Sequence, residues 1–205
     1  MISTTPGFVP IHGGKPTAKR YIGATVFIDH FSDFTYTHLM TELNAASTTE
    51  AKHAFERLSK SHDVNIHHYH ADNGLFDTKL FTASIQKSGQ TLSFCGVNAH
   101  DQNGKAEKRI RDVTDGAQTA LLHAIHRWPN AINATLWPAA LKNYITVRNN
   151  VPTRFASNVA GDKRKRNDKT FDSSPLSRFS GLEIPIQVKD FHPFGSPVYV
   201  LENKL

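Results

Sequence analysis

The chain has 205 residues, of which 39% are hydrophobic and 20% charged, so it has enough apolar material for a core and lacks the composition of a disordered chain. A formal net charge of +6 favours polyanionic partners. The single cysteine, Cys95, excludes an intramolecular disulfide and a Cys-rich zinc module. No stretch approaches the roughly 18 apolar residues of a membrane span and no signal peptide is evident, so we expect a soluble, intracellular protein.

A hairpin is predicted after an irregular lead-in. Residues 1–20 are rich in Gly, Pro and Thr, which favours turns over helix. The segment from Tyr21 to His30 has the apolar run of a buried strand, and the segment from Phe34 to Met40 has the pattern of a second strand. The short polar segment between them is typical of a turn.

Helices and strands alternate beyond the hairpin. Apolar residues recur at helical spacing in four segments, and two short apolar runs between them are typical of strands. The predicted helices begin near residues 48, 78, 104 and 135, and the predicted strands cover residues 64–70 and 91–95. We expect Ser47 or Thr48 to cap the first helix and Asp77 or Thr78 to cap the second. Residues 96–103 have the composition of an exposed loop.

The composition changes beyond residue 152. Residues 153–190 are poor in apolar side chains and contain the run Lys163-Arg164-Lys165-Arg166, which predicts a mobile basic linker. Such a run is typical of a nuclear import signal, of a phosphate-binding loop or of a merely solvated linker, and all three interpretations stay open. Residues 191–205 have the pattern of a turn and a strand, and we expect them to begin an extension after a core that covers residues 21–152.

Two carboxylates are placed for metal-dependent chemistry. Asp72 follows a predicted strand, and Glu107 lies near the start of the long predicted helix, with thirty-four residues between them. Carboxylates from separate elements can share Mg²⁺ or Mn²⁺ ions that promote phosphoryl transfer, usually with a third carboxylate. The spacing alone is not specific, because a chain with eighteen acidic residues holds many such pairs.

The sequence around both carboxylates resembles the second and third acidic motifs of Copia-type LTR retrotransposon integrases. These segments are Asp72-Asn73-Gly74 and Gln102 to Arg111. The segment from Phe27 to Ser32 resembles the second-strand motif of that family, and Phe194 to Val200 resembles the segment after its core. Retroviral integrases share the pattern more distantly. The resemblance implies an α/β fold of the RNase H-like type, with a mixed five-stranded sheet flanked by helices and metal ions held by an Asp, Asp, Glu triad. Residues 1–20 would then be either the irregular lead-in or the remnant of an incomplete first strand.

The resemblance also implies a function, partners and a location. It implies DNA integration, by 3′-end processing and strand transfer, in a homo-oligomer that binds element ends and target DNA. The location would be nuclear, after a cytoplasmic particle stage. Asp72 and Glu107 would be the catalytic metal ligands, and Asn73 and Asn103 would shape the loops around them. The residues expected to bind nucleic acid are Lys105, Lys108, Arg111, Asn103 and Asn73. Ile110 departs from the family, which often has Asn there.

The first Asp of the triad is expected just upstream of Met1, so we expect the fragment to be inactive unless Asp29 serves as a third carboxylate. The other interpretation makes Asp29 a turn residue that binds nearby backbone amides, as we expect for Asp33. For the helix, the alternative to DNA contacts is an ordinary ion pair between Glu107 and Arg111, worth about 0.2–0.5 kcal/mol. Two rival functions stay open, which are a non-catalytic DNA-binding remnant and an RNase H-like nuclease.

A zinc site at His67, His68 and His70 is disfavoured by strand alternation. On a strand His68 and His70 face one way and His67 the other, so we interpret them as polar strand residues. Cys95, next to an apolar run, is interpreted as a small buried hydrophobic residue rather than a nucleophile.

Overall fold

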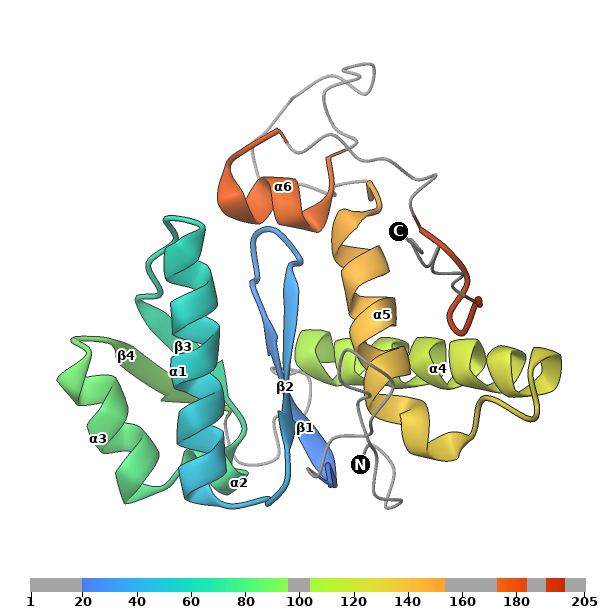
Figure 1. Ribbon diagram of the computed structural model, residues 1–205. Helices are drawn as coiled ribbons and strands as arrows, with labels where there is room; N and C mark the ends of the chain where they lie inside the picture. Colours follow the sequence, from blue (N-terminus) through green and yellow to red (C-terminus); the bar gives the residue numbers. More distant parts are fainter. Residues whose placement is uncertain (1–19, 96–103, 154–172, 184–190, 198–205) are drawn as a thin grey trace, which may run out of the picture.

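The computed structural model describes residues 20–95, 104–153, 173–183 and 191–197 of a mixed α/β protein (Figure 1). Its strands are β1 (Gly23–Ile28), β2 (Thr35–Met40), β3 (His68–Ala71) and β4 (Thr91–Phe94). Its helices are α1 (Ala45–Ser61), α2 (Asn73–Phe76), α3 (Lys79–Lys87), α4 (Gly104–Arg127), the 3₁₀ turn η2 (Ala134–Leu136), α5 (Trp137–Asn150) and α6 (Pro175–Ser180). Within these residues, no helix combines the length and apolar character that a membrane span requires.

The predicted hairpin is confirmed. Strands β1 and β2 pair antiparallel, with Phe27 opposite Tyr36, and the Asp29 N–H donates to the Phe34 carbonyl at 2.9 Å where the turn begins. We refer to residues 29–34 as the hairpin turn. Asp33 lies within it at a φ of 64°, a left-handed conformation that Asp tolerates better than most residues.

The strand pair β3–β4 is parallel, with His68 opposite Thr91 and a hydrogen bond of 3.1 Å from the Cys95 N–H to the Ala71 carbonyl. Parallel neighbours need a crossover connection, and α2 and α3 supply it. Because both strands run the same way, Asp72 and Cys95 lie at the same end of this small sheet.

The predicted five-stranded sheet is not observed in the described part of the chain, where the four strands form two separate two-stranded sheets. The hydrogen bond at Asp29 fixes the register, so Ala24, Val26 and Ile28 direct their amide groups to the edge of β1 away from β2. Among the described residues no backbone hydrogen bond joins that edge to β3. The two sheets are connected by aromatic packing instead, since the Phe27 ring lies 6.2 Å from that of Tyr69.

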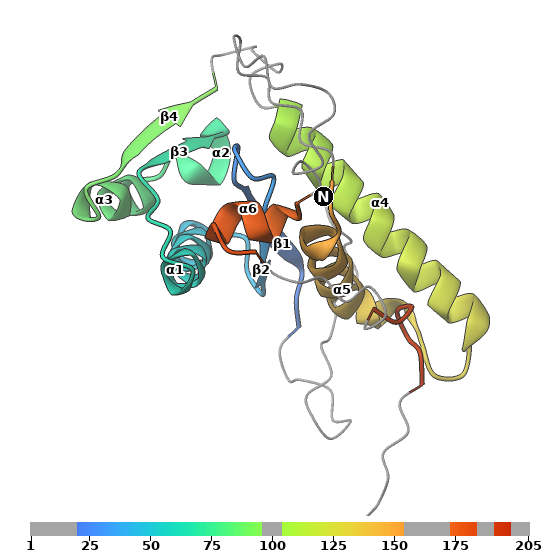
Figure 2. The same ribbon diagram turned by 90° about the horizontal axis from the view of Figure 1, so that it is seen from above.

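The hairpin lies between two hydrophobic cores. One core joins the hairpin to α1, α3, β3 and α6, and the other joins it to α4 and α5. The buried members of the first are Phe27, Phe34, Ala51, Phe55, Tyr69, Phe81, Ile85 and Phe179. The buried members of the second are Leu39, Val113, Ala117, Leu121, Trp137, Ala140, Leu141 and Ile145. Figure 2 shows the resulting order, with α1 and α3 on one side of the hairpin and α4 and α5 on the other.

Of the two N-cap predictions made from the sequence, one is confirmed and one is wrong. Thr78 caps α3 as predicted, by accepting a hydrogen bond from the Phe81 N–H. The prediction for α1 was wrong, because Asn44 is the cap and the Ser47 N–H donates to its side chain at 2.9 Å. Asn is as good a cap as Ser, and its position one turn earlier lets α1 start at Ala45.

The segment predicted as a linker contains a packed helix. Ser174 caps α6 through the Ser177 N–H, and Gly181 ends the helix at a φ of 68°. Phe179 is 8% exposed and stacks on Phe34 with ring centroids 4.3 Å apart. The folded unit therefore extends beyond residue 152. The basic run 163–166 lies outside the described residues.

The segment after the core is described for residues 191–197. The Ser196 N–H donates to the Pro193 carbonyl at 3.1 Å, which is the turn expected there. Phe194 packs against the second core, and Gly195 lies close to Ala124 and Trp128 at the end of α4. The strand predicted after this turn lies outside the described residues.

Helices α4 and α5 approach closely at Gly116, where an added Cβ would overlap the ring of Tyr144. We predict that Gly116→Ala lowers the free energy of unfolding by about 1–3 kcal/mol, because overpacking outweighs the gain in helix propensity. Chemical denaturation is the measurement. Gly104→Ala is the matched control in the same helix, since open space surrounds Gly104. Equal stability of the two variants would show that Tyr144 moves aside freely.

Candidate active site

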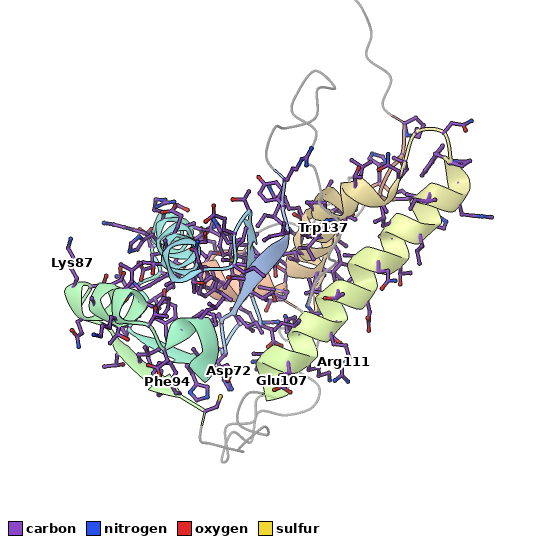
Figure 3. All side chains as sticks on the ribbon, turned by 90° about the horizontal axis from the view of Figure 1, so that it is seen from below. Asp72, Lys87, Phe94, Glu107, Arg111 and Trp137 are labelled. Carbon is purple, nitrogen blue, oxygen red and sulfur yellow. The ribbon has the colours of Figure 1, made fainter. Side chains whose placement is uncertain are left out.

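Asp72 and Glu107 come from different elements. Asp72 follows the last residue of β3, and Glu107 belongs to the first turn of α4. Figure 3 shows both side chains at the edge of the molecule where β3 ends and α4 begins. Both are exposed to solvent. This edge can therefore present two carboxylates to a ligand that arrives from outside.

Their donor chemistry suits a hard cation, because Mg²⁺ and Mn²⁺ prefer carboxylate oxygen. Two ligands are fewer than the three carboxylates that such sites usually have. Among the described residues no group of three His, Cys, Asp or Glu side chains is placed to hold a metal ion. The carboxylates of Asp72 and Glu107 therefore do not amount to a complete metal site by themselves.

Asp29, the residue considered as a third carboxylate, is engaged in the hairpin turn. Its Oδ2 atom accepts hydrogen bonds from the Ser32 N–H at 2.7 Å and from the Ser32 hydroxyl at 2.6 Å. This is the local bonding that favours Asp at the start of turns.

Asp33 connects the hairpin turn to the start of α4. Its carboxylate lies 2.7 Å from the Lys105 Nζ and 3.6 Å from a guanidinium nitrogen of Arg109. Lys105 also donates to the His30 carbonyl at 2.6 Å. Lys105 was predicted to bind DNA, and in this structure its ammonium group is held by the turn.

The electrostatic balance keeps Asp33 ionised. Burial raises the pKa of its carboxyl, but the hydrogen bond from Lys105 and the charges of Lys105, Arg109 and Arg178 outweigh that effect. The pKa of Asp33 therefore lies below its ordinary value, and the carboxylate is charged at neutral pH.

Arg109 is a structural residue that was not predicted from the sequence. It is 5% exposed, and it donates to the Asp33 carbonyl at 2.9 Å and to the Thr35 hydroxyl at 2.6 Å. The signal was present in the sequence, because Arg109 precedes Val113 and Ala117 at four-residue spacing and so lies on the buried face of α4.

Asn149, near the end of α5, binds the strand that leaves the hairpin turn. Its side-chain oxygen accepts from the Thr35 N–H at 3.0 Å, and its amide nitrogen donates to the Thr35 carbonyl at 2.7 Å. The amide side chain thus supplies the acceptor and the donor that the backbone of a neighbouring strand would otherwise supply to Thr35. The first residue of β2, directly after the hairpin turn, is thus bound from α5.

The remaining predicted contact residues differ in how the structure places them. Lys108 and Arg111 are exposed on α4, and Figure 3 shows Arg111 about one helical turn beyond Glu107. The ion pairs found among the described residues do not include one between Glu107 and Arg111. Asn73 is the first residue of α2, directly after Asp72. Asn103 lies outside the described residues.

The outer face of β3–β4 carries a hydrogen-bonded row that was not predicted. The Ser93 hydroxyl lies 2.9 Å from His68 Nε2 and 2.8 Å from His70 Nδ1. His68 Nδ1 is 2.7 Å from the Thr91 hydroxyl, and His70 Nε2 is 3.4 Å from the sulfur of Cys95. The histidines therefore have polar partners within the protein, and Cys95 is both buried and within hydrogen-bond distance of an imidazole.

The sequence matches no protein-family model and no curated protein. Among solved structures, it is similar to a chain of the simian T-cell lymphotropic virus intasome in complex with PP2A regulatory subunit B56 gamma, with a TM-score of 0.54 and 12% identity. That match covers 90% of this chain and 58% of the other. The similarity shows a shared fold between this chain and somewhat more than half of that viral chain.

Two further solved structures have lower scores. The catalytic core domain of BIV integrase has a TM-score of 0.48 and 18% identity, over 75% of this chain and 82% of that one. The HTLV-2 integrase catalytic core domain in complex with magnesium has a TM-score of 0.47 and 13% identity, over 85% of this chain and 93% of that one.

We predict that Asp33→Asn destabilises the protein by about 1 kcal/mol at neutral pH, a modest value because the ion pair is partly exposed to solvent. Asn tolerates a positive φ, so the change removes charge without adding backbone strain. Because the folded-state pKa lies below the ordinary value of 3.8, the contribution is complete above that pH and is lost as the pH falls through the lowered pKa.

Thermal unfolding from pH 7 to pH 2 measures this difference. Asp63→Asn is the matched control, because Asp63 also has a positive φ of 58° and is exposed. A difference between wild type and Asp33→Asn that persists unchanged at pH 2 would contradict the assignment to the carboxylate charge.

Proposed function

We propose that this chain is the core of a Copia-type retrotransposon integrase, which processes and joins element DNA ends to target DNA. The observation that carries the proposal is the placement of Asp72 after β3 and Glu107 in the first turn of α4, on a fold shared with a viral intasome chain. The motifs around both residues support the Copia assignment. A homo-oligomer that acts in the nucleus, after a cytoplasmic particle stage, belongs to the same proposal.

In this proposal Asp72 and Glu107 provide two of the carboxylates for Mg²⁺ or Mn²⁺. Such ions supply Lewis-acid stabilisation of charge on phosphate oxygens when they are bound. The third ligand has to come from outside the described residues, since no three-ligand group forms within them. The part played by the described residues is to hold two carboxylates on rigid elements at one edge.

The exposed basic residues of α4 define where DNA would lie. Lys108 and Arg111 are exposed and follow Glu107 along the helix, whereas Lys105 is bound to the hairpin turn. Phosphates held by Lys108 and Arg111 would place the DNA backbone beside the carboxylates. A duplex that runs along this face would bring a phosphodiester bond to the edge that carries Asp72.

We predict that Glu107→Gln abolishes the joining of DNA ends while the midpoint of thermal unfolding changes by no more than about 1 °C, because the residue is an exposed carboxylate. The measurement is the yield of donor duplex joined to plasmid DNA in the presence of Mg²⁺. Asp115→Asn is the control, since Asp115 is an exposed carboxylate further along the same helix. Normal joining by Glu107→Gln would refute the assignment.

The same assay separates the rival functions. Shortened DNA without joined product would indicate an RNase H-like nuclease. DNA binding without any change in the DNA would indicate a non-catalytic DNA-binding protein of this fold. Of these two rival functions, the non-catalytic one is favoured, because the described residues hold no group of three metal ligands and a nuclease of this fold would need one.

We predict that replacing both Lys108 and Arg111 by Ala weakens the binding of duplex DNA. The slope of log K against log salt should become shallower by about 0.9 for each phosphate that the protein no longer neutralises. Fluorescence anisotropy at several salt concentrations measures both quantities. Lys87→Ala is the control, because Lys87 is an exposed cation at the far end of α3, well away from Arg111 in Figure 3. A larger decrease in affinity for Lys87→Ala would place the DNA on a different face.

A further inference from the structure

Arg178 of α6 donates hydrogen bonds both to the hairpin turn and to the segment between α5 and α6. Nε and Nη2 donate to the Ser32 carbonyl at 3.2 and 3.0 Å, and Nη2 also donates to the Thr153 hydroxyl at 2.9 Å. Nη1 donates to the Ser173 carbonyl at 2.6 Å and to the Thr153 carbonyl at 3.2 Å. These five hydrogen bonds match the five N–H groups of a guanidinium. Figure 1 shows α6 lying across the end of the hairpin, beside the end of α5.

The hairpin turn is also bound by α4. Lys105 holds the His30 carbonyl and the Asp33 carboxylate, and Arg109 holds the Asp33 carbonyl. These two basic residues lie two positions before and two positions after Glu107. The first turn of α4 is therefore attached to the same six-residue turn that Arg178 binds.

We propose that Arg178 is a positioning residue for Glu107, acting through the hairpin turn and the contacts of Lys105 and Arg109; the proposal rests on the function assigned to Glu107 above. The first turn of a helix lacks part of its internal hydrogen bonds and frays unless tertiary contacts restrain it. A small displacement of a reacting group can cost about 100-fold in rate. The hydrogen bonds of Arg178 described above reach the hairpin turn and the segment before α6, so the turn is the connection through which Arg178 acts on the start of α4.

The alternative is that Arg178 only fastens α6 to the surface. In that case its loss loosens α6 and leaves the start of α4 unchanged. Hydrogen exchange distinguishes the two, because it reports the local opening of each segment separately. This measurement does not depend on catalytic activity, so it tests the inference even if the chain joins no DNA.

The experiment compares Arg178→Gln and Arg178→Lys with wild type, and uses Arg57→Ala as the control because Arg57 is an exposed arginine paired with Glu50 on α1. For Arg178→Gln we expect faster amide exchange in residues 105–111 with unchanged protection in residues 113–127. We also expect DNA affinity within about twofold of wild type but a fall of about tenfold or more in the joining rate at saturating DNA. Arg178→Lys, which keeps the charge and some donors, should recover part of both effects.

Unchanged exchange in residues 105–111 of a folded Arg178→Gln variant would overturn the inference. If wild type joins no DNA but the exchange result is as expected, the coupling stands and the assigned function fails. If Arg178→Gln does not fold, Thr153→Val removes a hydroxyl that accepts a hydrogen bond from Arg178 and should produce a smaller change in the same amides. No change there would likewise contradict the coupling.

Discussion

The hairpin turn between β1 and β2 is the point on which the arrangement of the helices depends. A tight turn leaves carbonyl groups without strand partners, and a buried carbonyl left unpaired costs about 1–3 kcal/mol. Here basic side chains from two helices supply the missing donors, Lys105 and Arg109 from α4 and Arg178 from α6. Asp33 adds a carboxylate that all three cations stabilise. One short segment thereby fixes elements that are far apart in the sequence.

This arrangement explains how two exposed carboxylates can be held in place although the described strands form two separate sheets. Asp72 is fixed by β3, which packs on α1 through the first core. Glu107 is fixed by α4, which packs on α5 through the second core. The hairpin contributes to both cores and is bound at its turn by α4, so it sets the position of one carboxylate relative to the other.

The sequence predicted those features that depend on local patterns. The hairpin, the cap at Thr78 and the long helix α4 follow from apolar periodicity and capping chemistry, and the structure confirms them. Features that depend on distant contacts were not predicted. Phe179 lies in a polar segment, and only the three-dimensional position of Phe34 shows that it is a core residue. A basic residue such as Arg109 is interpreted as a surface residue until the buried face of its helix is traced.

The contact between Arg178 and Ser32 joins residues that are 146 positions apart in the chain. Contacts between residues so far apart in the sequence form late in folding, because closing the long loop between them costs conformational entropy before the contact contributes any stability. During synthesis the chain from residue 33 to residue 177 has to leave the ribosome before the hairpin turn can be completed. The start of α4 would therefore reach its final position only after Arg178 has been made, and on shorter nascent chains the hairpin turn lacks the donors that Arg178 supplies.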